Sequence, residues 1–182
     1  MKVLSIQPTP NPNAYKFFLD RTLAARPREI GDAAKAKDDP LASALFAIPG
    51  VKSLFFMDDF VTVTWDDSAD WRSVTDQVRV LLEKHDGAGS PLTPAAAGAE
   101  GAAGVDDSEL MNKIQAVLDD RVRPALAGDG GGLEVVGLDS KVLRIRYQGA
   151  CGTCPSSVAG TLMAIQNMLQ SEVDEELQVI NA

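Results

Sequence analysis

Residues that bind soft metals are scarce in this sequence. The chain of 182 residues contains two cysteines, Cys151 and Cys154, and one histidine, His85. A secreted scaffold held together by disulfides would need more cysteines, and a close cysteine pair in a reducing compartment is more often a metal or redox site than a structural bond. The sequence therefore excludes a disulfide scaffold and leaves few thiolate or imidazole ligands for a metal in each chain.

Long apolar runs and clusters of basic residues are also missing. No segment approaches the roughly 18 consecutive apolar residues of a membrane helix, and the first residues do not form a secretion signal or a transit peptide. The formal net charge is −9, and most of the acidic excess lies in 87–182. Nucleic acids and anionic membranes are therefore poor partners, because like charges repel. We expect a cytoplasmic protein whose partners are proteins.

Residues 87–106 differ in composition from the rest of the chain. Gly, Ala, Pro, Ser and Thr fill 16 of these 20 positions. Such a segment buries too little apolar surface to offset the entropy of ordering it, so the composition predicts a flexible linker. We therefore expect an α+β protein with two small two-layer domains, at 1–86 and 107–182, on either side of a flexible Gly/Ala/Pro linker at 87–106.

Strand and helix patterns alternate in the first domain. The predicted elements are strands at 3–7 and 14–19, a polar break at 36–40, a helix at 41–48, a hairpin of strands at 51–57 and 60–65, and a second helix. Three prolines in 8–13 forbid a helix there. The hairpin turns at Asp58–Asp59 and places Val61, Val63 and Trp65 on one face. The second helix has an apolar stripe formed by Trp71, Val74, Val78, Leu81 and Leu82.

The predicted order of elements in the second domain is helix, strand, strand, helix, strand. The residues Asp106, Asp107 and Ser108 are expected to cap the first helix, and Pro124 is expected to end it. The predicted elements after it are a loop at 128–132, strands at 133–138 and 141–147, a helix that begins at Pro155, and a last strand at 177–180. The two helices have apolar stripes at Leu110, Ile114, Val117 and Leu118, and at Val158, Thr161, Leu162, Ile165, Met168 and Leu169. This order indicates helices on one face of a sheet.

The cysteine pair lies in a loop, 149–157, between a predicted strand and a predicted helix. Two intervening residues let both thiolates face one metal centre, and glycines let the backbone approach a bulky ligand. The amides at the start of the following helix favour negative charge and hence the thiolate form. The sequence places the chemistry of the protein in this loop.

Three interpretations of the pair compete. Burial as two small hydrophobic side chains is disfavoured by the glycine-rich turn. A thiol-disulfide oxidoreductase also has C-x-x-C at a helix start, but its fold needs more strands and helices than the residues after Cys154 provide. A zinc site or an iron–sulfur cluster needs about four ligands, so a second chain must supply two of them. His85 is a poor candidate because it ends a surface helix across the linker, whereas pairing two loops across a two-fold axis completes a Cys₄ site.

Several motifs resemble the NifU-like and Nfu-type iron–sulfur cluster scaffold proteins. Residues 121–136 and 148–157, with the cysteine pair, are similar to the C-terminal domain of NifU. Residues 9–13 with Lys16 and Phe17, then 45–51, then 59–63, are similar to the N-terminal domain of Nfu-type scaffolds. The resemblance covers nearly everything outside the linker.

The resemblance implies a carrier that binds a [4Fe-4S] cluster between two chains. Cys151 and Cys154 are the cluster ligands that it implies. It also implies a homodimer when loaded, partners that are apo iron–sulfur client proteins and upstream cluster-assembly proteins, and a first domain that contributes partner contacts. Clients and donors are not inherited from the motif, because the second domain occurs in other arrangements within the family.

Other polar features have structural explanations. The glycine run at 128–132 lacks the Lys-Ser/Thr ending of a phosphate-binding loop and is expected to be a turn that can pack near the cluster. Arg121 and Arg123 fit a helix end, with docking of an acidic partner as an alternative. The acidic pairs that begin at Asp38, Asp58, Asp66, Asp106 and Asp119 fall at turns and helix ends. We predict no catalytic residue and no enzyme activity.

Overall fold

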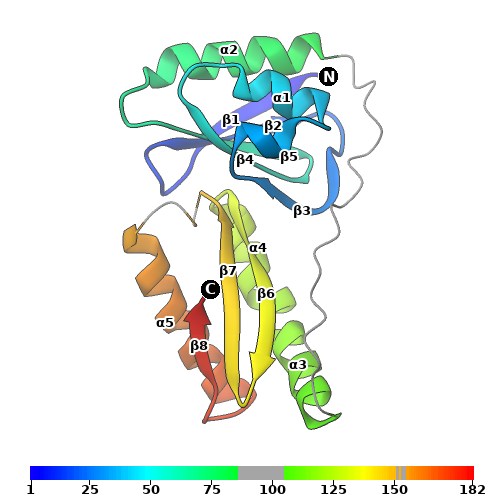
Figure 1. Ribbon diagram of the computed structural model, residues 1–182, viewed down its shortest axis with the longest axis vertical. Helices are drawn as coiled ribbons and strands as arrows, with labels where there is room; N and C mark the ends of the chain where they lie inside the picture. The colour runs from blue at the N-terminus through cyan, green and yellow to red at the C-terminus, as the bar shows by residue number, and fades with distance from the viewer. Residues whose placement is uncertain (86–104, 151, 153–154) are drawn as a thin grey trace. The chain divides into compact units, whose positions relative to one another are not determined.

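The chain folds into two compact units, Met1–Ala95 and Ala96–Ala182. The computed structural model (Figure 1) describes residues 1–85, 105–150, 152 and 155–182, without the side chains of 105–108 and 155–159. Each unit combines one sheet with helices, so the prediction of two small α+β domains is confirmed. The domain bounds 1–86, 87–106 and 107–182 stay predictions. None of the helices in the described ranges is long and apolar enough to cross a membrane.

The first unit is an antiparallel sheet of five strands with two helices. The strand order is β1-β2-β5-β4-β3. The elements are β1 (Val3–Pro8), β2 (Ala14–Leu19), β3 (Ala24–Ile30), the 3₁₀ turn η1 (Ala33–Ala36), α1 (Pro40–Phe46), β4 (Val51–Asp58), β5 (Phe60–Trp65) and α2 (Trp71–Lys84). The predicted hairpin is confirmed: β4 pairs with β5 and Met57 faces Phe60 across the turn.

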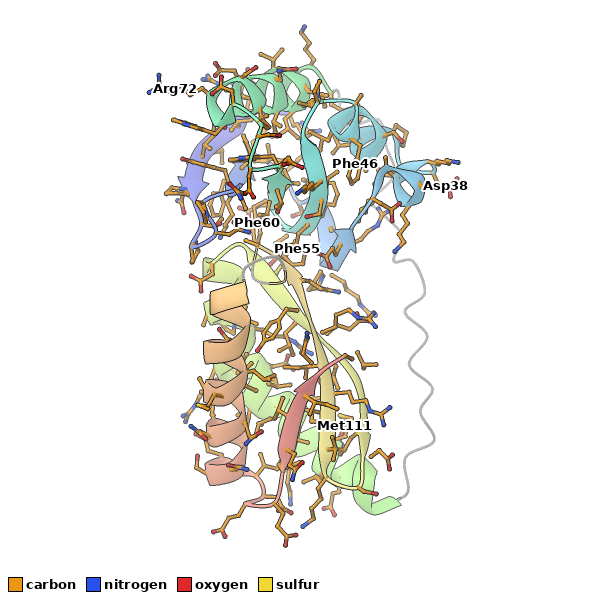
Figure 2. The ribbon with its side chains drawn as sticks, turned by 60° about the vertical axis from the view of Figure 1, so that its left-hand side comes forward. Asp38, Phe46, Phe55, Phe60, Arg72 and Met111 are labelled. Atoms are coloured by element: carbon orange, nitrogen blue, oxygen red, sulfur yellow. The ribbon has the colours of Figure 1, made fainter. Side chains whose placement is uncertain are left out.

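The two faces of this sheet carry different side chains. Val61, Val63 and Trp65 lie in the core together with Val74, Val78 and Leu82 of α2, as the periodicity predicted. Side chains alternate along a strand, and the strand neighbours of Phe18, Phe55 and Phe60 lie in this core, so these three lie on the other face. Figure 2 labels Phe55 and Phe60. The Phe60 ring contacts those of Phe18 and Phe55, and the Lys16 ammonium lies 4.3 Å from the Phe60 ring centroid. Both faces of the sheet are therefore rich in apolar side chains.

Strand β3 was not predicted. It contains Pro27 and is shifted in register against β4 between Ala24 and Arg28. Proline cannot donate to a ladder of hydrogen bonds, so within sheets it is confined to edges and irregular positions. β3 lies at the sheet edge, where this loss is tolerated.

Trp71 does not belong to the buried stripe of α2, so that part of the prediction is wrong. It is 45% exposed at the first residue of the helix. Its ring stacks on Tyr15, with centroids 5.9 Å apart and an interplanar angle of 3°, and Tyr15 stacks in turn on Trp65. For Trp71, stacking on the partly buried Tyr15 ring therefore replaces burial in the core.

The second unit places helices on one face of a three-stranded sheet, as predicted. The strand order is β6-β7-β8, with β7 antiparallel to β6 and parallel to β8. The elements are α3 (Val105–Val117), the π-helical turn η2 (Leu118–Val122), α4 (Arg123–Gly128), β6 (Gly131–Asp139), β7 (Val142–Gly149), α5 (Pro155–Glu172) and β8 (Gln178–Asn181). Leu143, Ile145 and Tyr147 of β7 pack in the core with Ile165 and Leu169 of α5.

Pro124 does not end the first helix of this unit, and that prediction is wrong. The chain stays helical from α3 through η2 and α4, and Pro124 occupies the first turn of α4. The Arg123 N–H donates to the Leu118 carbonyl, five residues back. A wider π turn removes the need for the hydrogen bond that proline cannot make and relieves the clash of its ring with the preceding turn. α3 also begins at Val105, ahead of the expected cap at Asp106, Asp107 and Ser108.

Asp39 joins α1 to β3 in the first unit. It is 2% exposed, caps α1 by accepting from the Ala42 N–H at 3.0 Å, and accepts from Arg28 Nη1 at 2.9 Å. We expect Asp39→Ala to lower the free energy of unfolding of this unit by about 3 kcal/mol, because it removes a cap and leaves a partly buried guanidinium without its carboxylate. Urea unfolding followed by fluorescence measures this, since Trp65 and Trp71 are the two tryptophans of the chain.

Asp32→Ala is the matched control for that experiment. Asp32 caps η1 by accepting from the Lys35 N–H, but both side chains are exposed. The expected loss is below about 1 kcal/mol. Equal losses in the two variants would show that the burial of Asp39 contributes nothing.

Lys141 and Asp174 connect the β6–β7 turn to the segment before β8. The backbone N–H of Glu176, followed by the Lys141 ammonium, lowers the pKa of Asp174. Since this pKa is lower in the fold than in the unfolded chain, the contact stabilises the unit above a pH of about 4, and this contribution is lost as the pH falls through the folded pKa.

We expect an NMR titration to place the midpoint of Asp174 below the ordinary aspartate value. In Lys141→Met the midpoint should rise only part of the way, because the Glu176 N–H still donates to the carboxylate. A midpoint that Lys141→Met leaves unchanged, or returns fully to the ordinary value, would contradict this order of causes.

Candidate functional site: the cysteine loop

The cysteine loop connects the end of β7 to the start of α5 (Figure 1). Cys151, Thr153 and Cys154 lie outside the residues that the structure describes, so the predicted ligands stay a prediction. The residues on both sides of them are described, from Gly149 and Ala150 to the backbone of α5. These flanking residues form the frame of the site.

A pair of glycine backbones closes the sheet beneath the loop. Gly131 of β6 faces Gly149 of β7, and the Ala150 N–H donates to the Gly130 carbonyl at 3.3 Å. Gly130 and Gly149 have φ angles of 78° and 68°, in the left-handed region that favours glycine. The predicted glycine run therefore contacts the cysteine loop, and the contact is made by Ala150, the residue before Cys151.

The bounds predicted for that run need correction. Instead of one loop at 128–132, Gly128 ends α4, Asp129 and Gly130 form the turn, and Gly131 begins β6. The turn is closed by hydrogen bonds from the Asp129 and Gly130 N–H groups back to α4. The run thus forms a turn between a helix and a strand, as expected from its sequence.

Gly152 is fixed by a close backbone approach inside the loop. Its N–H donates to the Gly149 carbonyl at 3.2 Å, and a Cβ added to it would lie 3.0 Å from the Tyr147 carbonyl oxygen. Any other residue would press on the backbone of β7. Gly152 is also exposed to solvent. Gly152, which follows the first predicted ligand, thus lies in a tight turn and is accessible to solvent.

The base of the loop is anchored in the core of the second unit. Tyr147 and Ala150 are both buried, and Tyr147 packs in the same cluster as Ile165 of α5. On its far side the loop runs into α5, whose first residue, Pro155, has no N–H to leave unsatisfied. Sheet and helix thus fix the two ends of a short loop.

The electrostatics of the frame favour thiolates. The start of α5 presents backbone N–H groups with no partner inside the helix, and its first turn contains no acidic residue. The charged side chains on the adjacent strands pair with each other, since Arg146 lies 3.8 Å from Glu134. Within 1–85, 105–150 and 155–182, no three His, Asp or Glu side chains come together as a metal site.

His85 and the two arginines are held by structural contacts. His85 ends α2 by donating its N–H to Leu81, and its carbonyl accepts from the N-terminal ammonium at 3.2 Å. Arg121 pairs with Glu172 at 2.6 Å, and Arg123 pairs with Asp119 and Gln115. Arg121 lies in the π turn and Arg123 directly follows it. The prediction that both lie at a helix end is therefore wrong, because the chain stays helical to Gly128. Partial burial lowers the pKa of Arg123.

Comparisons with known proteins cover both units. Residues 4–89 match the family described as scaffold protein Nfu/NifU N terminal, and residues 114–180 match the NifU-like domain. The human NFU1 iron-sulfur cluster scaffold homolog, mitochondrial, is 35% identical over 174 residues, which cover 94% of this chain and 68% of the relative. The chain belongs to the Nfu/NifU scaffold family.

A plant relative agrees with this assignment. NifU-like protein 4, mitochondrial, of Arabidopsis thaliana is 36% identical over 182 residues, which cover 94% of this chain and 63% of the relative. The chain thus spans 63% to 68% of the length of these two Nfu/NifU relatives. A solved NifU-like protein from Saccharomyces cerevisiae is 31% identical, covers 46% of this chain and 79% of its own, and superposes with a TM-score of 0.41.

The sequence pattern did not predict the contacts that hold the loop of this Nfu/NifU chain. The bond between Ala150 and Gly130 and the close approach at Gly152 involve backbone atoms. The only signal for them is the presence of glycine at 130, 149 and 152. Glycine marks positions where backbones come close, but it does not say which ones meet.

We expect Gly152→Ala to lower the free energy of unfolding of the second unit by about 1–2 kcal/mol, because the new methyl group presses on the Tyr147 carbonyl. Amide hydrogen exchange at Leu143 and Ile145, in the core of β7, measures this. Gly128→Ala is the matched control, since its Cβ would meet nothing within 4 Å. Equal protection in both variants would mean that the loop relaxes without cost.

Proposed function

We propose that the chain is an iron–sulfur cluster scaffold and carrier that binds a [4Fe-4S] cluster between two copies through Cys151 and Cys154. The observation that carries the proposal is the cysteine count: a chain that aligns over 94% of its length with an iron-sulfur cluster scaffold homolog contains two thiols, both in one loop. A cluster with four thiolate ligands then needs two chains. A two-fold axis through the cluster supplies them with identical loops.

The frame of the loop supports cargo that is held and then released. Buried residues and a strand end anchor its base, while Gly152 between the two cysteines is exposed. A ligand bound there is fixed in position and still reachable by a second protein. That combination suits delivery better than permanent retention.

Transfer proceeds by exchange of thiolate ligands. A thiol of the apo-protein loses its proton and its sulfur binds an iron atom, and the bond from that iron to Cys151 or Cys154 breaks. The released thiolate takes up a proton, so no electron is transferred and no co-reactant is needed. Four such exchanges move the cluster. The helix start that stabilises thiolates makes Cys151 and Cys154 good ligands and tolerable leaving groups.

In this proposal the chain is not an enzyme, and its partners are apo iron–sulfur proteins and the assembly proteins that load it. The first unit contains no cysteine, so its contribution is contact with partners. A cytoplasmic location stays a prediction from the sequence, and the relatives compared above are named mitochondrial.

Anaerobic reconstitution with iron and sulfide tests this function. We expect about four irons and four sulfides per two chains, with sedimentation at the mass of a dimer. Cys151→Ala and Cys154→Ala should each abolish the bound iron, because each removes two of four ligands from the dimer. Thr153→Ala, in the same loop, is the matched control and should load normally.

The alternatives give different results in the same experiment. A thiol-disulfide oxidoreductase would reduce insulin and form a reversible Cys151–Cys154 disulfide in the monomer, and a zinc adaptor would yield zinc in elemental analysis. A monomer that holds a full cluster, or a Cys151→Ala variant that retains it, would overturn the proposal.

A further inference from the structure

Helix α5 has an exposed face without charged residues. From Pro155 to Ser171 the sequence contains no Asp, Glu, Lys or Arg, although 24% of the chain is charged. In the described part of the helix the outward residues recur every three or four positions and form one stripe, opposite the buried Ile165 and Leu169. We call this stripe the outer face of α5, and its residues are Gly160, Met163, Ala164, Asn167 and Ser171.

Met163 dominates the outer face of α5. Its side chain is 68% exposed, which is the largest value for a large hydrophobic side chain in the described part of the chain. The exposed residues of α2 differ, since they include Arg72, Asp76, Arg79 and Glu83. Protein interfaces are depleted in charged residues at their centres and enriched in methionine. The outer face of α5 has this composition, whereas α2 has that of a solvated helix.

Among the described residues, nothing explains sterically why position 160 is a glycine. It lies inside α5, where glycine is less favourable than alanine, and a Cβ added to it would meet nothing within 4 Å. Its φ is not in the left-handed region, so the backbone does not require glycine either. Close approach of another backbone is the remaining physical use of glycine at an exposed helix position.

We infer that the outer face of α5 packs against the same face of a second copy of this chain when the cluster is bound. This inference rests on the proposed function, because the shared cluster supplies the need for a second copy. α5 begins directly after Cys154, so a symmetry axis through the cluster passes near the starts of both α5 helices. A surface next to that axis meets its own copy, and such a contact must be complementary to itself.

The charge of the chain supports the same occupant. Two copies with a net charge of −9 each repel, so they approach most easily through a surface that contains no charge. The one acidic residue at the end of α5, Glu172, is paired with Arg121 at 2.6 Å within its own chain. Met163 and Ala164 then supply apolar area, and Asn167 supplies an amide that can pair with its own symmetry mate.

The test compares four forms of the full chain after anaerobic reconstitution: the unsubstituted chain, Ala164→Glu, Asn167→Asp and, as the control, Ala116→Glu. Ala116 is an exposed alanine on α3 of the same unit. Sedimentation equilibrium measures the dissociation constant of the loaded dimer. We expect Ala164→Glu to raise it at least about tenfold, because two like charges become buried at the contact, and Ala116→Glu to change it less than about twofold.

Asn167→Asp adds a charge with almost no change in volume, so it tests the contact even where Ala164→Glu disturbs folding. We expect it to raise the dissociation constant as well, with a thermal midpoint of the unloaded chain equal to that of the unsubstituted form. If both variants dimerise as tightly as the control, the inference is overturned and the proposed function stands. If the unsubstituted chain takes up no cluster, the proposed function itself fails.

A client surface is the remaining outcome. Variants that keep the loaded dimer but lose transfer to an apo-protein acceptor would assign the outer face of α5 to the client. That result would also overturn the inference.

Discussion

Close contact between glycine backbones is the constraint on which the cysteine loop depends. Gly131 faces Gly149 at the end of the β6–β7 ladder, and the Gly130 carbonyl holds the Ala150 N–H. Gly130 and Gly149 have φ angles of 78° and 68°, which residues with a side chain adopt only with strain. Because the turn lies this close, the chain leaves the sheet at a defined point and in a defined direction. This backbone contact, together with the burial of Tyr147 and Ala150, therefore fixes where the chain enters the cysteine loop.

Periodic burial made much of the fold predictable from the sequence. The strand β5 and the helices α3 and α5 each bury one row of apolar side chains, and rows of this kind repeat every two residues in a strand and every three or four in a helix. Val61, Val63, Ile114 and Leu169 accordingly lie in the cores where the pattern places them. The position of the cysteine loop between a strand and a helix followed from the same periodicities.

The features that were missed lack such a signal. β3 contains a proline and pairs irregularly at an edge, so its sequence shows no clean alternation. The helix that passes Pro124 does so through a π turn, and local preferences at proline indicate a helix end instead. Trp71 fits the stripe of α2 by spacing, but it is 45% exposed and stacks on Tyr15 of β2 instead of entering the core. In each case the tertiary surroundings decided against the local preference, and a single sequence does not contain them.

The parallel pairing of β8 with β7 restrains the position of α5. α5 leaves the end of β7 through the cysteine loop and returns to the same strand at its other end, where Val142 faces Gln178. The helix is thus connected to β7 at both ends, by the cysteine loop before it and by β8 after it. A shift of α5 along its axis would pull β8 out of register with β7. A change of register by one residue would turn Val179 out of the core. The pairing of β8 with β7 therefore opposes sliding of α5 along its axis.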